Sequence, residues 1–187
     1  GGAAAGRGRR GCQGRTTGRR WGWANGGLVH AGVYAALAGK LAAAVTKLKP
    51  APGTDTSATQ GPLIDDKAVA KVESHIADAT AKGARVLVGG KRHALGGLFY
   101  EPTLLTGVTS EMKVAREETF GPVAPLFRFK TEEEVVTLAN ATEFGLAAYF
   151  YYSDVGSVFR YAEAMDSGLV GSTVGMLPHA VARVRGI

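Results

Sequence analysis

The sequence offers few residues whose type and spacing favour chemistry. Its four histidines lie far apart: His30, His75, His93 and His179. Their separation fits no metal-ligand motif, and helical periodicity predicts that His75 lies on an exposed helix face. The single cysteine, Cys12, excludes an internal disulfide and a zinc site built from several cysteines. From the histidine and cysteine positions together we expect no metal site. No nucleophile elbow, P-loop or catalytic cysteine–histidine pair is present either.

One local cluster stands apart, the segment Glu-Glu-Thr-Phe-Gly-Pro at 117–122. Two adjacent carboxylates, Glu117 and Glu118, come directly before a turn that contains the aromatic ring of Phe120. On spacing alone, the favoured interpretation is a solvated acidic pair before a turn, and the alternative is a functional site. Considered by itself, the sequence therefore predicts an α/β domain with no visible active site.

The net charge of +6 resides entirely in residues 1–27, which hold six arginines and no acidic residue. Two interpretations of this Arg/Gly-rich segment remain open. It could bind RNA phosphates as a flexible cationic tail, or it could be a degraded stretch, since Gly, Ala and Arg make up 20 of its 27 residues. Residues 28–187 carry 16 basic and 16 acidic groups, so they predict neither a nucleic-acid nor a membrane partner.

The composition is that of a globular protein, with 45% apolar and 20% charged residues over 187 positions. No apolar run approaches the roughly 20 residues of a membrane span, and the amino end lacks the apolar stretch of a signal peptide. We therefore expect a soluble, cytoplasmic protein. Because the first residue is Gly rather than Met, we expect a fragment or a processed chain.

Apolar periodicity predicts alternating helices and strands. Helices are expected at 33–48, 67–82, 131–140 and 157–165, and strands at 85–90, 100–105, 124–129, 146–152 and from 169. The strand at 85–90 is expected to be buried, Pro102 predicts an edge strand at 100–105, and the run at 146–152 predicts a central strand. Gly83 should end the second helix, and Thr131 with Glu134 should form a capping box. The alternation indicates an α/β class with a mostly parallel sheet flanked by helices.

Several motifs arrive in an order that resembles the aldehyde dehydrogenase superfamily, and most closely its succinate-semialdehyde branch. They are Gln-Gly-Pro-Leu-Ile at 60–64, Lys-Gly-Ala-Arg-Val at 82–86, Tyr-Glu-Pro-Thr-Leu-Leu at 100–105, Glu-Glu-Thr-Phe-Gly-Pro-Val at 117–123 and Asn-Ala-Thr-Glu-Phe-Gly-Leu at 140–146. The resemblance is dense over 32–171 and covers less than half of such an enzyme, so the fold it implies is incomplete. It assigns 28–187 to a partial catalytic domain, leaves 1–27 as a degraded segment over the nucleophile loop, and implies that the cofactor-binding domain lies upstream.

The resemblance also implies a mechanism. A cysteine thiolate attacks the aldehyde, the thiohemiacetal passes hydride to NAD or NADP, and a glutamate-activated water hydrolyses the thioester. Glu118 matches the acid that holds the nicotinamide ribose hydroxyls, and Phe120 matches the ring packed beside the nicotinamide. The base glutamate and the oxyanion asparagine would lie upstream of this chain. Family members act on small aldehydes as homo-oligomers.

The nucleophile loop departs from the family pattern. Where the family has Gly-Gln-Thr-Cys followed by Val-Cys-Ala-Asn, this chain has Gly-Arg-Arg-Trp-Gly-Trp-Ala-Asn at 18–25. Trp21 therefore occupies the nucleophile position, and Trp23 replaces a second cysteine. Arg15 matches an arginine that grips the substrate carboxylate, whereas Cys12 matches a non-catalytic position. Further mismatches lie near the carboxyl end, at Thr173, Pro178 and 183–186.

Three hypotheses follow from these departures. Many of the mismatches can be explained by exchanging C and G at one base of a codon, and the alignment with the family keeps its register throughout. The first hypothesis is therefore a normal dehydrogenase gene whose sequence was read with errors at both ends. The second is a catalytically dead scaffold whose tryptophans are real. The third is a binding module with an Arg/Gly-rich RNA-binding tail. In each case no catalytic residue is intact, and we expect the chain as written to be inactive in aldehyde oxidation.

Overall fold

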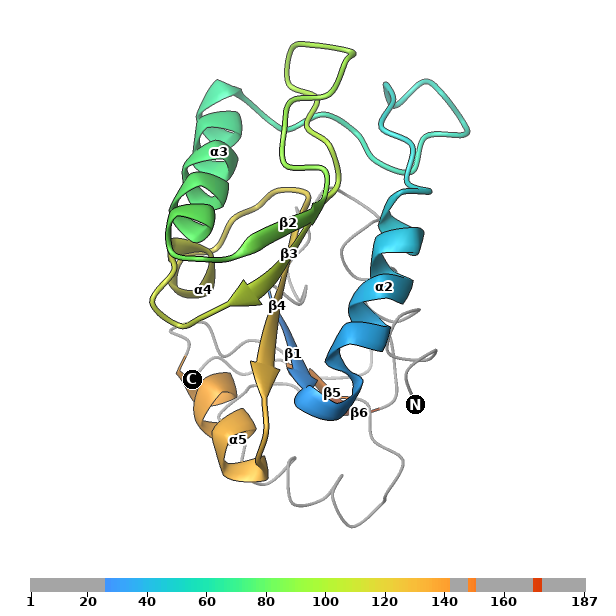
Figure 1. Ribbon diagram of the computed structural model, residues 1–187. Coiled ribbons are helices and arrows are strands. Elements are labelled where there is room, and N and C mark those ends of the chain that lie inside the picture. Colours follow the sequence, from blue (N-terminus) through green and yellow to red (C-terminus); the bar gives the residue numbers. More distant parts are fainter. Residues whose placement is uncertain (1–25, 142–147, 151–169, 173–187) are drawn as a thin grey trace.

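The computed structural model describes residues 26–141, 148–150 and 170–172 (Figure 1). The elements are β1 (Gly27–His30), the 3-10 helix η1 (Ala31–Val33), α2 (Tyr34–Val45), α3 (Asp66–Ala81), β2 (Arg85–Val88), β3 (Thr103–Val108), α4 (Lys113–Arg116), β4 (Val123–Phe129), α5 (Glu132–Asn140), β5 (Ala148–Phe150) and β6 (Val170–Ser172). The expected α/β class is confirmed. The helix expected at 157–165 lies outside the described residues, as do most of the strand at 146–152 and the segment 1–25.

The main sheet has four strands in the order β1-β4-β3-β2. Strands β1, β4 and β3 run parallel, and β2 pairs antiparallel with β3, so the sheet is mixed rather than wholly parallel. A register shift between Leu105 and Val108 marks a bulge in β3, where Gly107 has φ +68°. The hydroxyl of Tyr34 bridges β3 and β4 at this bulge. It accepts a hydrogen bond from Gly107 N at 2.8 Å and donates one to Leu126 O at 2.9 Å. Strands β5 and β6 form a separate parallel pair.

Helices cover both faces of the main sheet (Figure 1). Neighbouring residues of β3 point to opposite faces, as a pleated strand requires. Leu105 packs with the buried face of α3, and Leu104 packs with Ala38 and Leu41 of α2. Helix α5 packs through Val135 against Phe129, the last residue of β4. The layers are therefore helix, sheet and helix, with α3 on the face of the sheet to which Leu105 points.

The three helix predictions that fall on described residues are confirmed to within a few residues. The inward positions expected for α3 are all buried: Val69, Val72, Ile76 and Ala79. Asp65 caps the start of this helix by accepting from Ala68 N, and Gly83 ends it at φ +97°. At α5, Thr131 accepts from Glu134 N as the capping box predicts, but the Glu134 carboxylate accepts from Lys130 N, one residue before the expected donor.

Two strand predictions were wrong. Strand β2 was expected to be buried, yet it lies at the sheet edge, where Val86 and Leu87 are 37% and 47% exposed. The 100–105 strand was expected at an edge, yet β3 lies between β2 and β4. Pro102 does not prevent this, because the ladder of β3 begins one residue later, at Thr103. Among the described helices, none is long and apolar enough to cross a membrane.

Candidate cofactor-binding segment

The cluster singled out in the sequence, residues 117–122, connects α4 to β4. We call it the 117–122 segment. Helix α4 ends at Arg116, and Glu117 continues with an extended backbone, φ −114° and ψ 141°. Pro122 O accepts a hydrogen bond from Thr103 N at 2.7 Å, which fixes the end of the segment to the start of β3. The segment therefore lies across the beginning of two parallel strands, on the side of the sheet that α3 covers.

His75 of α3 is the residue that contacts the 117–122 segment most directly. Its Nδ1 lies 2.8 Å from Thr119 Oγ1, and its Nε2 lies 3.1 Å from a carboxylate oxygen of Glu117. The prediction of an exposed His75 was wrong, because the ring is 1% exposed. The histidine follows the apolar stripe of α3 and is covered by a segment more than 40 residues away in sequence, which local periodicity does not reveal.

The hydrogen-bond partners determine the tautomer of His75. A carboxylate only accepts, so Nε2 carries the proton and donates it to Glu117. Nδ1 is then an acceptor, and the Thr119 hydroxyl donates to it. Burial lowers the pKa of His75 below its ordinary value, Glu117 opposes this shift, and the charges of Lys71 and Lys113 add to it. The neutral ring therefore satisfies both of its polar partners.

Acidification is expected to destabilise the fold through this ring. Since the pKa of His75 is lower in the folded chain than in the unfolded chain, the unfolded chain binds more protons below about pH 6.5. We expect the free energy of unfolding to fall as the pH drops from 6.5 toward 5, and to fall less steeply in His75→Asn. Urea unfolding of both chains at several pH values measures this slope. Parallel curves for the two chains would show that His75 does not titrate in this way.

The two adjacent acids of the segment differ in their surroundings. The hydrogen bond from His75 holds the pKa of Glu117 below its ordinary value and engages one of its two carboxylate oxygens. Glu118 is half-buried, and no hydrogen bond or ion pair joins its carboxylate to the part of the chain that the structure describes. The Glu117 side chain is nevertheless 51% exposed, so the interpretation of a solvated acid holds for it, with His75 as an added partner. Glu118 is the acid of this pair that makes no hydrogen bond or ion pair with the described part of the chain.

Phe120 has an unusual backbone. Its φ is +36°, which makes it the one non-glycine residue with a positive φ among the described residues. Its ring is 41% exposed, although a large apolar side chain gains free energy by burial. A left-handed conformation at a bulky residue is rare and costly, and such outliers cluster at ligand sites. The backbone therefore holds a large aromatic side chain partly exposed on this segment.

Gly121 lets the segment approach α3 closely. A Cβ at this position would lie 2.5 Å from Cγ2 of Val72 and 3.7 Å from Cδ2 of Leu63. Val72 is fully buried, so it cannot move aside without disturbing the core of α3. Only glycine fits here.

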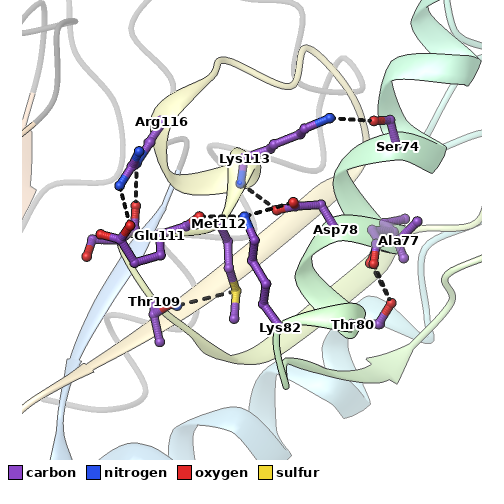
Figure 2. Close-up of polar contacts among 12 residues, drawn as sticks. Ser74, Ala77, Asp78, Thr80, Lys82, Thr109, Glu111, Met112, Lys113 and Arg116 are labelled. Atoms are coloured by element: carbon purple, nitrogen blue, oxygen red, sulfur yellow. Dashed lines mark hydrogen bonds and ion pairs between the residues drawn. The ribbon is translucent and has the colours of Figure 1, made fainter.

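A polar network fastens α4 to α3 just before the segment (Figure 2). Asp78 accepts from Lys113 N at 2.8 Å and pairs with Lys82 Nζ at 2.8 Å. Lys82 also donates to Glu111 O at 2.7 Å. Met112, the residue before α4, is fully buried. Helix α3 thus contacts this region at three points: Asp78 binds Lys113 N before the segment, His75 binds side chains within it, and Val72 lies against Gly121 near its end.

The geometry suits an organic cofactor better than a metal. A carboxylate without a described partner beside an exposed aromatic ring can accept hydrogen bonds from hydroxyl groups and stack on a flat heterocycle. No group of three metal-ligating side chains occurs among residues 26–141, where side chains are described. Glu118 and Phe120 are two residues apart on the 117–122 segment, and the structure describes both. Arg15, Cys12 and Trp21 lie outside the described residues.

Comparison with known proteins settles the family. Residues 23–185 match the aldehyde dehydrogenase family. The chain belongs to this family. The match begins at Trp23, so the position that the resemblance assigns to the nucleophile, Trp21, precedes the matched range.

Relatives in the aldehyde dehydrogenase family show how much of the molecule this chain represents. It is 57% identical over 159 residues to the succinate-semialdehyde dehydrogenase [NADP(+)] of Escherichia coli (strain K12) and 56% identical over 159 residues to the 3-sulfolactaldehyde dehydrogenase of Pseudomonas putida. Each match covers 85% of this chain and 33% of the relative. The crystal structure of succinate-semialdehyde dehydrogenase from Burkholderia pseudomallei matches with a TM-score of 0.97 and 56% identity, over 100% of this chain and 39% of that one. The chain thus spans about a third of the length of the curated relatives it matches.

Proposed function

We propose that this chain is part of the catalytic domain of an NAD- or NADP-dependent dehydrogenase that oxidises a small anionic aldehyde, such as succinate semialdehyde, to the acid. In the balanced reaction, the aldehyde, water and NAD(P)⁺ give the carboxylate, NAD(P)H and two protons. The observation that carries the proposal is the 117–122 segment. Glu118 lacks a described partner and Phe120 is held exposed at a positive φ, within a chain that belongs to the aldehyde dehydrogenase family.

Glu118 and Phe120 are the residues that would hold the cofactor. The Glu118 carboxylate accepts hydrogen bonds from the hydroxyls of the nicotinamide ribose, and the Phe120 ring packs beside the nicotinamide. When bound, NAD(P)⁺ supplies the oxidising equivalent. We do not assign this role to Glu117, because one oxygen of its carboxylate accepts from His75 and its side chain is thereby directed toward α3. The name of the E. coli relative specifies NADP(+).

The substrate class is proposed from the relatives and from Arg15. Succinate semialdehyde carries a carboxylate and 3-sulfolactaldehyde carries a sulfonate, so the substrates named for both relatives have an anionic group besides the aldehyde. A guanidinium binds either anion through two parallel hydrogen bonds. Arg15 is the residue to which we assign this contact, with the substrate aldehyde directed toward position 21.

A graft tests this function in a complete enzyme. In the E. coli relative, the stretch that matches residues 26–141 is replaced by those residues of this chain, and the rest of the enzyme is kept. We expect the graft to reduce NADP⁺ with succinate semialdehyde and to do so poorly with butanal, which lacks the anionic group. The parent enzyme is the control. A graft that folds as the parent does but forms no NADPH would contradict the proposal.

Within this graft, Glu118→Gln is expected to raise the KM for NADP⁺ about tenfold or more, because a charged acceptor that binds hydroxyls is lost. Glu117→Gln is the matched variant. Its amide oxygen still accepts from His75, so the KM should change by less than about threefold. Initial rates at varied NADP⁺ measure both. Equal effects of the two substitutions would remove the assignment of Glu118 to the cofactor.

Compartment and assembly belong to the same proposal. The cytoplasm and a homo-oligomeric enzyme are what the resemblance implies for the whole protein. Relatives from Rattus norvegicus and Arabidopsis thaliana are named as mitochondrial, so the compartment varies among family members. Size-exclusion chromatography with light scattering of the graft gives the assembly: a mass equal to one subunit would contradict the homo-oligomer.

A further inference from the structure

We propose that His75 is a positioning residue that determines which of the two adjacent acids faces the cofactor. The inference rests on the proposed function, and it concerns a histidine that neither the family resemblance nor the reaction assigns. His75 lies on α3, outside the 117–122 segment, and touches neither Glu118 nor Phe120 through any described hydrogen bond. Its effect is exerted through the residues on either side of Glu118.

The argument begins with the direction of three consecutive side chains. Glu117 and Thr119 both reach the same imidazole, at 3.1 Å and 2.8 Å, so both side chains point toward α3. The backbone at Glu117 is extended, and where two side chains on either side of a residue meet the same group, the side chain between them points to the opposite side. Glu118 therefore faces away from His75. A slip of one residue would exchange the two acids.

Histidine suits this task because its two nitrogens have different roles. The Nε2–H donor selects a carboxylate, and the Nδ1 acceptor selects a hydroxyl. The ring therefore requires a carboxylate and a hydroxyl two residues apart, and in this segment Glu117 and Thr119 meet that requirement. The reverse register would place Glu118 and Phe120 against the ring, and a phenyl group cannot donate to Nδ1.

Burial makes this selection rigid. The ring is 1% exposed and makes its two hydrogen bonds across more than 40 residues of sequence. The charged groups that face it are Glu117 at the end of α4, Lys113 within α4 and Lys71 on α3 itself. The two lysines disfavour the doubly protonated ring, which would lose its acceptor. The neutral Nε2–H tautomer is the form that holds the segment.

Hydrogen exchange of the complete 187-residue chain tests this role without cofactor or turnover. His75→Phe keeps a ring of similar size and removes both hydrogen bonds. We expect amide exchange across 117–120 to accelerate about tenfold, with α3 unchanged. The matched control is Glu73→Gln on the same helix, which weakens the pair with Arg92 (2.7 Å) and should affect the loop around 91–101 instead. Unchanged exchange at 117–120 in His75→Phe would overturn the proposal.

Thr119 provides a second variant pair that leaves the buried ring in place. Thr119→Val removes the hydroxyl and should accelerate the same amides, whereas Thr119→Ser keeps the hydroxyl and should restore wild-type exchange. Nitrogen-15 spectra of the imidazole should show the Nε2–H tautomer in the wild-type chain. An Nδ1–H tautomer, or no difference between the Val and Ser variants, would contradict the positioning role.

The consequence for the cofactor is measured in the graft. His75→Phe should raise the KM for NADP⁺ about tenfold while kcat changes less, because the ribose contact is misplaced but the reacting atoms are not. A fall in kcat with unchanged KM would overturn the inference. If the proposed function is wrong, the unsubstituted graft will be inactive. Hydrogen exchange and the imidazole tautomer of the 187-residue chain will then still test the role of His75.

Discussion

Replacing Trp21 with cysteine is expected to convert an inactive enzyme into an active one. For this measurement the graft is extended to residues 15–141, so that it carries both Arg15 and Trp21. An indole cannot attack a carbonyl carbon, whereas a thiolate at this position can form the covalent thiohemiacetal. We expect NADPH formation from succinate semialdehyde to rise at least about 10³-fold in Trp21→Cys, as befits the gain of a covalent nucleophile.

Two controls make the Trp21 result specific. Trp21→Ala removes the bulky ring without adding a nucleophile, and it should remain inactive. The shorter graft of residues 26–141, which keeps the parent nucleophile loop, should be active. If Trp21→Cys stays inactive while the shorter graft works, the match of position 21 to the nucleophile is wrong, and the dead-scaffold or RNA-binding alternatives gain support.

Adding a single methyl group at Gly121 is expected to destabilise the chain by about 1–3 kcal/mol, the usual cost of overpacking a core. In Gly121→Ala the new Cβ would lie 2.5 Å from Cγ2 of the fully buried Val72, so either the 117–122 segment or α3 must move. Urea unfolding followed by circular dichroism gives the change. The displaced segment should also raise the KM for NADP⁺ in the graft.

Gly39→Ala is the matched control for Gly121→Ala. Gly39 lies on the exposed side of α2, and no atom lies within 4 Å of a Cβ built there. The same substitution should therefore stabilise the chain by about 0.5–1 kcal/mol, through the better helix propensity of alanine. A destabilisation of equal size at both glycines would show that the close approach to Val72 is not the cause.

Local signals predicted the helices well. The prediction of α3 rested on the apolar positions at helical spacing and the glycine at 83, and the structure adds the acidic cap at Asp65; all of these act within a few residues. Helix α5 follows from its cap at Thr131 for the same reason. Each of these features concerns residues close in sequence, so periodicity and capping chemistry are sufficient to find them.

The strand errors have a different origin. Whether a strand lies at an edge depends on its neighbours in the sheet, and the partner of β2 is β3 on one side only. Apolar composition at 85–88 was mistaken for burial, although Val86 and Leu87 remain exposed. Pro102 was mistaken for an edge signal, although it precedes the ladder. No local property of either strand encodes its place in the order.

The candidate site shows the same limit. The resemblance identified Glu118 and Phe120, because their motif is local. It did not identify His75, whose partners lie more than 40 residues away and whose burial depends on the 117–122 segment crossing α3. The sequence signal was a histidine directly beside Ile76, a member of the apolar stripe of α3.

The central claim is that Glu118, and not Glu117, meets the cofactor. A crystal structure of the active graft with NADP⁺ bound tests it most directly, by the distances from the two carboxylates to the ribose hydroxyls of the nicotinamide half. We predict that a Glu118 oxygen lies at a hydrogen-bond distance of about 2.6–3.0 Å from a ribose hydroxyl, while Glu117 remains on His75. A ribose bound by Glu117, or by neither acid, would contradict the account.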